Sequence, residues 1–551
     1  MTDATAAGRI LPQPTLASAE FWSSGADGTL RIARCADCGA YTHPPLPACR
    51  ACGGRSMTFG PVSGNATVVA YTVNQQQWLP EFPPPYVVAI VALKEDDGVR
   101  LTTNIVGCDP ADVFIGMRVR VTFIKAEEVY LPLFEPAPGA QDEPGPVPAP
   151  PGRPVPRPPA SPERFEDKVA LTGVAQSEVG RRLMADPLSL TVNACQRAIA
   201  DAGLTLADID GLSSYPGPSP EGMSEGGVSP LVDALQLQPV WVNGVSETPG
   251  QIGAITAAML AVASGFCRHV LCFRTVWQAS HSALSRSGMW KPSAGRATGM
   301  MEFRHPFGAM SAANWIACAA SAYQHRYGGS RETLGWIALN ARANAARNPE
   351  AVYRDPLTMD DYLSARMIST PFGLYDCDVP VDGAVAVIVS AVDTVGDLDC
   401  TPVYVEAVGT QILERLSWDQ GTLTHLPQSL GPSAHLWSRT SLRPADVDVA
   451  ELYDGFTFNA LSWLEGLGFC EYGSAREFID EGRGIAIDGP LPLNTHGGQL
   501  SAGRLHGYGF VREAMLQLRG EADGRQVPGA RVAAVTAGGG VPSGAMLLRA
   551  G

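Results

Sequence analysis

The sequence predicts an α/β protein that carries a small β-rich, metal-binding unit at its N-terminus. Three observations lead to this fold class. Four cysteines near the N-terminus form two Cys-x-x-Cys pairs, several short β-type runs follow them, and the longer C-terminal part alternates buried strands with helices. A proline-rich stretch separates the two parts. The length of 551 residues suits two to four domains.

Composition excludes several broad classes of protein. Hydrophobic residues make up 45% and charged residues 17%, which excludes a chain that is disordered throughout. The formal net charge is −15, the wrong sign for binding nucleic acid or an anionic membrane. No apolar run reaches the ~18 residues of a membrane span, and residues 1–9 show no secretory signal. We therefore expect a soluble, cytoplasmic protein with mostly reduced thiols.

The cysteine cluster is the most specific pattern in the N-terminal part. Ten residues separate the two Cys-x-x-Cys pairs, and Gly39 and Gly53 follow the pairs, where tight turns are needed. Four thiolates close the coordination of Zn²⁺ and leave no position for water, so the predicted zinc is structural. His43 lies between the pairs and is expected to be a bystander. The predicted ligands are Cys35, Cys38, Cys49 and Cys52.

The rest of the N-terminal part predicts a small β-barrel. Residues 1–60 are expected to hold a short helix around 19–24 and the metal-binding ribbon. Residues 61–135 contain short β-type runs with turn residues between them, which is typical of a small barrel. These residues carry no basic stripe, so nucleic acid is not an expected partner. The runs span residues 66–73, 86–93, 100–106 and 118–124.

A linker and a large α/β unit follow. Residues 136–165 form the predicted linker, in which 12 prolines fall among the 27 residues 136–162 and exclude a helix or a central strand. Residues 166–551 open with a buried strand at 169–175. A helix is expected next, with Asp186 as its N-cap, Pro187 at its first position and Gly203 just past its end. Residues 384–389 read as another buried strand.

A zinc ribbon, preceded by a short helix and followed by a small barrel, resembles the DUF35 family, which combines a rubredoxin-like ribbon with an OB-fold. The resemblance covers residues 15–135. It implies association with thiolase-like proteins that handle acyl-CoA substrates.

Residues 166–551 resemble the thiolase superfamily, nearest to its sterol-carrier-protein branch. This implies a fold of duplicated αβαβα layers. Three groups of motifs carry the resemblance: Tyr-Arg-Asp-Pro-Leu-Thr at 353–358 with Arg-Met-Ile at 366–368, Asp-Cys at 376–377 and Asp-Gly-Ala at 382–384; Asn-Thr-His-Gly-Gly at 494–498 with Gly503; and Thr-Ala-Gly-Gly-Gly at 536–540.

The positions that match the thiolase catalytic residues all carry other residues. A thiolase needs a nucleophilic cysteine at a helix N-terminus, where the helix dipole favours the thiolate; Ser246 occupies the matching position. Tyr453 occupies the position that matches the histidine of the family's His-Asp-x-Phe motif. Arg504 occupies the position that matches the histidine of its Gly-His-Pro motif. Thr536 stands for the terminal acid/base cysteine. Chemistry through an acyl-cysteine is therefore not expected.

Two tyrosines suggest a different reaction. Tyr453 and Tyr508 match the catalytic tyrosines of thiolase-like steroid side-chain aldolases of the lipid-transfer-protein-2 type, which act with a DUF35 partner. The resemblance implies retro-aldol cleavage of a β-hydroxyacyl-CoA that bears a 17-hydroxyl, giving a 17-ketosteroid and acetyl-CoA or propionyl-CoA. CoA thus enters as part of the substrate. Neither a Schiff-base lysine nor a catalytic metal is implied.

The tyrosines can be given roles from the sequence alone. Tyr508 is expected to take the β-hydroxyl proton, with Arg504 four residues away to favour its anion, and Tyr453 to return the proton; the reverse assignment is also open. The enolate oxygen is expected to lie against backbone N–H groups near Gly538, Gly539 and Gly540, with His506 or Asn494. His496 and His506 are expected to orient groups rather than to act as bases.

Two other functions remain open at this point. One is an acyl-CoA acyltransferase or condensing enzyme that uses Ser246 as its nucleophile. The other is an acyl-CoA or sterol carrier without catalytic activity. In each case we expect a homodimer formed through the thiolase-like unit.

Overall fold

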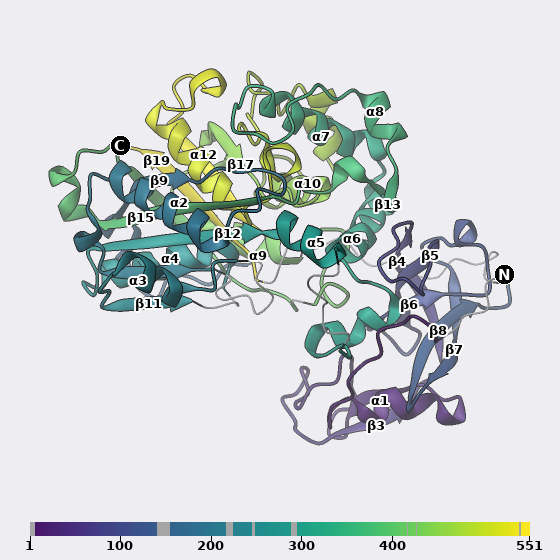
Figure 1. Cartoon of the computed structure of the whole chain (residues 1–551). Helices are drawn as coiled ribbons and strands as arrows, with labels where there is room; N and C mark the ends of the chain where they lie inside the picture. Colours follow the sequence, from purple (N-terminus) through teal and green to yellow (C-terminus); the bar gives the residue numbers. More distant parts are fainter. Residues whose placement is uncertain are drawn as a thin grey trace.

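The computed structural model describes residues 6–139, 152, 155–215, 224–244, 248–287, 295–415, 417–425, 427–538 and 542–551. A small β-rich unit built from the N-terminal residues lies beside a larger α/β unit built from the rest of the chain (Figure 1). This arrangement confirms the predicted fold class. In the part of the chain that is described, no helix is both long and apolar enough to cross a membrane.

The N-terminal unit begins with the ribbon. Helix α1 (Ala19–Ser23) precedes β1 (Arg31–Cys35), β2 (Tyr41–Thr42) and β3 (Met57–Pro61), which form a three-stranded antiparallel sheet in the order β2-β1-β3. The helix is short, but it buries two aromatic side chains against the barrel and the α/β unit. So little regular structure leaves the ribbon dependent on its metal site and its neighbours.

A closed five-stranded barrel follows the ribbon. Its strands pair in the order β4-β5-β6-β8-β7, and β7 pairs back with β4 to close it. The inward-facing side chains form one buried apolar cluster. Closure and strand number agree with the expected OB-fold. The strands are β4 (Asn65–Asn74), β5 (Tyr86–Leu93), β6 (Asp96–Ile105), β7 (Arg118–Ala126) and β8 (Val129–Pro136).

The first half of the α/β unit is a five-stranded mixed sheet in the order β11-β10-β12-β15-β9. Helix α2 (Pro187–Asp201) confirms the prediction made from its ends. The Asp186 carboxylate accepts from the Ser189 N–H at 2.8 Å, and Gly203 follows with a φ of +70°. The strands are β9 (Val169–Gln176), β10 (Gly211–Ser214), β11 (Trp241–Gly244), β12 (His269–Trp277) and β15 (Asp382–Ala391).

The second half repeats this order. In the first half, the strands lie side by side in the order third, second, fourth, fifth and first, counted along the chain. The strands of the second half lie in the order β17 (Val449–Glu451), β18 (Val532–Ala537), β19 (Gly544–Ala550) and β16 (Val403–Gly409), which correspond to the second, fourth, fifth and first strands. The third strand is reduced to a single bridge between Ala450 and Leu493. Pairing of β9 with β16 joins the halves into one nine-stranded sheet. The duplication expected of a thiolase fold is therefore present.

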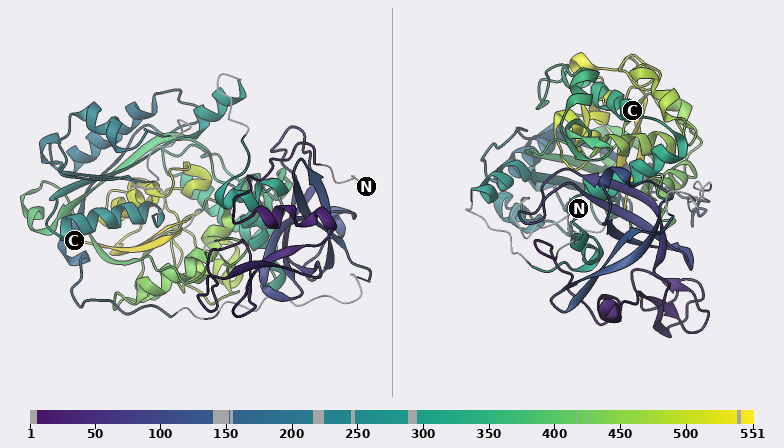
Figure 2. Two further views of the ribbon diagram at one scale, coloured as in Figure 1. Left: turned by 90° about the horizontal axis from the view of Figure 1, so that it is seen from below. Right: turned by 90° about the vertical axis from the view of Figure 1, so that its right-hand side faces the viewer.

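Two central helices lie between the halves and position the candidate site. Helix α4 (Gly250–Ala263) contacts β10, β12 and β15 of the first half and β18 and β19 of the second. Helix α12 (Tyr508–Arg519) contacts β17, β18 and β19, and also β15 and β9. Outer helices such as α2, α3 (Val228–Leu235) and α9 (Pro427–Trp437) cover the far faces (Figure 2). The N-termini of both central helices are thus deep inside the molecule.

Helices and a hairpin inserted between β12 and β15 of the first half, and helices inserted between β17 and β18 of the second half, form a third region. The strands of the hairpin are β13 (Met367–Ser369) and β14 (Phe372–Gly373). The other helices are α5 (Gln278–Arg286), α6 (Ala312–Tyr327), α7 (Arg331–Ala345), α8 (Met359–Ser364), α10 (Thr457–Gly466) and α11 (Ala475–Ile479).

The barrel docks on the α/β unit of its own chain by strand pairing. Strand β13 pairs with β4 at Ser369 and Asn74, so the hairpin extends the barrel sheet. The Thr370 N–H donates to the Val73 carbonyl at 3.1 Å, and the buried Asn314 amide donates to both Asn74 and Ser369. In this structure the N-terminal unit and the α/β unit therefore associate within one chain.

The proline-rich stretch connects the two units. Strand β8 ends at Pro136 and β9 begins at Val169. Residues 155–165, the last part of this stretch, carry neither helix nor strand, as the prolines predict, while residues 140–151 and 153–154 lie outside the described residues. The Arg157 N–H donates to the Gln411 side chain at 3.0 Å, which ties the stretch to the α/β unit.

Candidate active site

Four segments that are far apart in the sequence meet at the N-termini of the central helices. The Gln251 amide, in the first turn of α4, donates to the Gly507 carbonyl at 3.2 Å and to the Thr536 carbonyl at 3.0 Å. The Thr536 hydroxyl in turn accepts from the Tyr453 N–H at 2.8 Å. These are the segments in which the thiolase resemblance placed the site. Ser246, Gly539 and Gly540 belong to them but lie outside the described residues.

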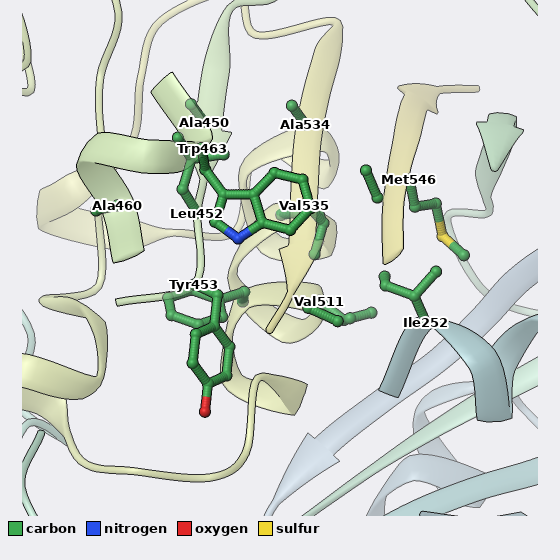
Figure 3. Packing of buried hydrophobic residues seen from close by; sticks show 14 of the residues in the cluster. Ile252, Ala450, Leu452, Tyr453, Ala460, Trp463, Val511, Ala534, Val535 and Met546 are labelled. Atoms are coloured by element: carbon green, nitrogen blue, oxygen red, sulfur yellow. The ribbon is translucent and has the colours of Figure 1, made fainter. Parts of the chain in front are cut away.

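Tyr453 follows β17 and presents its hydroxyl to this junction. Its ring is 5% exposed and lies against Gly538 and Phe510. Figure 3 shows the hydroxyl directed away from the packed side chains of Leu452 and Trp463. Burial raises the pKa of Tyr453 to about 12, against the opposing effects of the Arg504 charge and the Gln499 amide. The phenol is therefore neutral, with a cation at hand to favour its anion.

Arg504 lies beside Tyr453. Its Nε forms an ion pair with Oδ2 of Asp378 at 3.1 Å, and its Nη1 donates to the Gln278 side chain at 2.9 Å. Burial lowers the pKa of Arg504, but the charge of Asp378 and the hydrogen bond that Arg504 donates to Tyr453 outweigh this effect and raise the pKa. The predicted effect of Arg504 on Tyr508 stays a prediction: the chain turns at Gly507 between the two residues, and Arg274 is a cation that acts on Tyr508.

Gln499 reaches the Tyr453 hydroxyl from a π-helical turn, Gly498–Ala502. Such turns are rare and frequent at functional sites. Apart from this contact with the Tyr453 hydroxyl, the polar atoms of the buried Gln499 amide lack a hydrogen-bond partner in the described part of the chain. A buried amide with unused donor and acceptor capacity is available to a ligand.

Tyr508 is the first residue of α12 and is fully buried. Its hydroxyl has no hydrogen-bond partner among the described residues. Burial raises the pKa of Tyr508 well above its ordinary value, the Cys272 thiol adds to the rise, and the charge of Arg274 opposes it. Like Tyr453, Tyr508 is therefore neutral and keeps a proton that it can donate.

Tyr215, at the end of β10, is a third phenol that connects the surroundings of the other two. It contributes to the electrostatic environment of both Tyr453 and Tyr508. Burial raises the pKa of Tyr215, while the charges of Arg274 and Arg504 lower it. The hydroxyls of the predicted pair thus share neighbours, as a common pocket requires.

His506 is held as a neutral donor. Its Nδ1 lies 3.1 Å from Nη2 of Arg274, and because an arginine can only donate, Nδ1 is the acceptor and the ring proton is on Nε2. Burial and the charges of Arg504 and Arg274 hold the pKa of His506 well below its ordinary value. The geometry suits a hydrogen bond to a substrate oxygen and does not suit a general base.

The side chains of Asn494 and His496 bond to other groups of the protein. The Asn494 oxygen accepts from the Leu452 N–H at 2.7 Å, and its amide donates to the Leu452 carbonyl and to Asp454. His496 pairs with the buried carboxylate of Glu451 at 3.0 Å. Asn494 has no capacity left for an enolate oxygen, so we do not retain it for that role. His496 has the orienting place expected of it.

Sequence reasoning missed four residues of the site: Tyr215, Arg274, Asp378 and Gln499. Only Arg274 left a usable signal. It is a permanent cation in the middle of the apolar run of β12, whose nine residues are all buried. A charge at such a place marks a partner or a ligand. The other three stand in turns, where polar residues are ordinary.

The four cysteines of the ribbon form a second site at the far end of the molecule. The two closest sulfur pairs are 3.7 Å apart for Cys35 and Cys52 and 3.6 Å for Cys38 and Cys49. A tetrahedron of thiolates about 2.3 Å from zinc has edges of about 3.8 Å. Gly39 and Gly53 have φ values of +78° and +74°, as the predicted turns require. The residues therefore fit a structural zinc ion.

Fold and site together define a thiolase-like enzyme whose cysteine and histidine positions carry other residues. Family models match the chain in three places: a rubredoxin-like zinc ribbon domain of ChsH2 over residues 22–58, the C-terminal OB-fold domain of ChsH2 over residues 60–123, and a thiolase C-terminal domain-like model over residues 422–548.

Characterised relatives cover the α/β unit at nearly their full length. The 17-hydroxy-3-oxo-4-pregnene-20-carboxyl-CoA lyase of Mycobacterium tuberculosis is 31% identical over 387 residues, which are 69% of this chain and 99% of that protein. The steroid side-chain-cleaving aldolase of Thermomonospora curvata is 32% identical over 69% of this chain and 97% of that protein. A solved Ltp2-ChsH2(DUF35) aldolase covers 70% of this chain and 98% of its own, with 29% identity and a TM-score of 0.61.

The chain belongs to the thiolase-like steroid side-chain aldolases, and it carries a zinc ribbon and OB-fold of the ChsH2 (DUF35) type in the same polypeptide. It is a carbon–carbon lyase.

Proposed function

We propose that this enzyme cleaves a β-hydroxyacyl-CoA thioester to a ketone and a shorter acyl-CoA, with Tyr453 as the base and Tyr508 as the acid. The observation that carries the proposal is that two buried phenols share the neighbour Tyr215 at the thiolase centre, where the matched positions hold neither a cysteine nor a histidine. The substrate class rests on the lyase named above, which by its name acts on a 17-hydroxy steroid CoA thioester. A 17-ketosteroid and acetyl-CoA or propionyl-CoA are the corresponding products.

The assignment of base and acid follows from the charges. Removal of the β-hydroxyl proton needs a phenolate, and Arg504 lies where it stabilises the anion of Tyr453. Tyr508 is neutral and therefore has a proton to give to the α-carbon. In the balanced step the β-oxygen becomes the ketone, the electrons of the Cα–Cβ bond pass to the thioester enolate, and a proton then adds to Cα.

The barrel supports this site in the proposal. From its pairing with β13 the chain runs through Phe372, which stacks on Phe456 with ring centroids 5.4 Å apart. It then reaches Asp378, whose N–H donates to the Gly455 carbonyl at 3.0 Å and whose carboxylate holds Arg504. The docked barrel is thus connected by short steps to both Tyr453 and its cation.

The function is tested with purified protein and the CoA thioester of a 17-hydroxy steroid side chain. Mass spectrometry should find equimolar 17-ketosteroid and short acyl-CoA. Simpler alicyclic β-hydroxyacyl-CoA thioesters define how much of the ring system is needed. Binding of these thioesters without any product would instead favour the carrier function, and an acyl group trapped on Ser246 would favour the acyltransferase.

We also propose that the enzyme is a homodimer formed through the edge strand β11. This strand ends the nine-stranded sheet, and its neighbourhood exposes large apolar side chains: Val240 is 62% exposed, Val242 50% and Phe266 61%. A second copy can pair with this open edge and cover these residues about a two-fold axis.

Replacing Val242 by Asp should therefore convert the dimer to a monomer of 58.1 kDa. Light scattering after size-exclusion chromatography measures the mass. Replacing the exposed Val155, far along the chain in the proline-rich stretch, serves as the control and should leave the dimer intact. A wild-type chain that elutes as a monomer at micromolar concentration would rule this dimer out.

A further inference from the structure

Arg274 is a buried cation with unused hydrogen-bonding capacity. It lies in the middle of β12 and is 4% exposed. Nη2 bonds to His506, but Nε and Nη1 are buried and have no partner among the described residues. Each buried donor without an acceptor costs free energy, so a native protein rarely keeps two on one side chain without a use for them.

Arg274 makes no ion pair among the described residues. The charge of Glu225 acts on Arg274, but the two Glu225 oxygens accept from other groups: the Ser214 hydroxyl at 3.2 Å and the Thr275 N–H at 3.1 Å. Arg504, by contrast, forms a close ion pair with Asp378. Of the two site arginines, Arg274 is the one with two buried donors that no described residue accepts.

Other donors surround the same place. Tyr508 and Arg274 interact electrostatically, and the Tyr508 hydroxyl also lacks a partner in the described part of the chain. The third donor is Nε2–H of His506, which is fixed by the bond that Arg274 makes to Nδ1. Arg274 and Tyr508, whose donors have no acceptor among the described residues, thus lie near the Nε2–H of a neutral imidazole, and a ligand oxygen that gains negative charge can accept from all three.

We propose that Arg274, with Nε2–H of His506, binds the thioester carbonyl oxygen of the substrate and the enolate oxygen that it becomes. The inference rests on the proposed retro-aldol function and adds the group that stabilises its intermediate. When the Cα–Cβ bond breaks, its electron pair forms the enolate C=C bond and the carbonyl π electrons move to the oxygen beside Arg274. When Tyr508 protonates Cα, these electrons return and the thioester carbonyl forms again.

The division of labour is consistent with the substrate's own geometry. The enolate oxygen is two bonds from Cα, so its binding group must lie next to the acid that protonates Cα. Arg274 lies next to Tyr508, whereas Arg504 lies next to Tyr453, the base for the β-hydroxyl on the other side of the Cα–Cβ bond. Each phenol thus works beside its own arginine.

The test compares Arg274→Gln with Arg439→Gln as a matched control. Arg439 is also largely buried and pairs with Glu166 at 2.7 Å, outside the site. Loss of an oxyanion donor should lower kcat for cleavage by about 10²–10³-fold with a much smaller change in KM. Arg439→Gln should keep kcat within a few-fold of wild type, whatever it loses in stability.

A binding measurement separates this role from a structural one. The probe is a CoA thioether that carries a nitroalkyl group, because its nitronate anion has the charge and shape of the enolate. Wild type should bind this probe about 10²-fold more tightly than Arg274→Gln does, while a plain S-alkyl CoA thioether should bind both proteins alike. Equal binding of the plain thioether shows that the pocket is intact.

The outcomes distinguish this inference from the proposed function. If Arg274→Gln cleaves the substrate as fast as wild type and binds the nitronate as tightly, the role of Arg274 is overturned and the aldolase function stands. If wild type cleaves no β-hydroxyacyl-CoA, the proposed function itself fails. If Arg274→Gln does not fold, Arg274→Lys restores the charge on a different shape and should recover only part of the nitronate affinity; full recovery would contradict a directed hydrogen bond.

Discussion

Replacing Tyr508 by Phe should lower kcat for carbon–carbon cleavage by about 10³-fold, because general acid–base groups contribute on the order of 10²–10⁴ to a rate. The structure makes this substitution unusually clean. The Tyr508 hydroxyl is buried and has no hydrogen-bond partner among the described residues, so its removal breaks no contact. We therefore expect a thermal midpoint equal to or slightly above that of wild type.

Tyr327→Phe is the matched control. The Tyr327 hydroxyl is another phenol with a buried oxygen; it interacts with Thr424 and lies outside the site. Its removal should leave kcat unchanged. Steady-state kinetics and thermal unfolding of both variants decide the matter. Full activity of Tyr508→Phe would end the catalytic role that we propose for this residue.

The partner substitution Tyr453→Phe should cost about as much activity, with a different dependence on pH. A base with a pKa of about 12 is almost wholly protonated at pH 7, and its active fraction rises tenfold with each pH unit. The logarithm of kcat in wild type should therefore rise with a slope near one from pH 7 to pH 9. The residual activity of Tyr453→Phe should lack this slope. A flat profile in wild type would contradict Tyr453 as the base.

Removal of zinc should unfold the ribbon. Structural zinc contributes on the order of 10 kcal/mol to the folding of small thiolate sites, and the ribbon has only three short strands to replace it. Cys38→Ser or prolonged chelation should leave strands β1 to β3 unprotected in hydrogen exchange. Strands of the α/β unit should keep their protection, since their core is a separate cluster of buried side chains.

Metal analysis by mass spectrometry provides the control for this experiment. Wild type should hold one zinc ion per chain, and Cys108→Ser, which changes a cysteine outside the ribbon cluster, should keep it. Normal protection of the ribbon in a protein shown to be free of zinc would contradict a structural role for the metal.

The sequence allowed the ribbon, the barrel and an α/β unit to be predicted because each rests on local chemistry, while the thiolase fold was implied by a family resemblance. Cys-x-x-Cys pairs, period-two runs and a helix with Asp186 and Pro187 at its start depend on residues within a few positions of one another. The docking of the barrel could not be predicted in this way. It rests on a pairing between Asn74 and Ser369, nearly 300 residues apart, and no local pattern marks either residue as an interface.

For the site, the sequence determined which residues replaced the thiolase cysteines and histidines, and so pointed to the pair of phenols. The tertiary structure decided which cation serves which phenol. Arg504 is near Tyr508 along the chain but bonds beside Tyr453, and Tyr508 receives its arginine from β12, more than 230 residues earlier. The physical reason is that electrostatic partnership depends on distance through space and on burial. A sharp turn before helix α12 changes the distances between these residues and their burial, and the sequence spacing does not show this change.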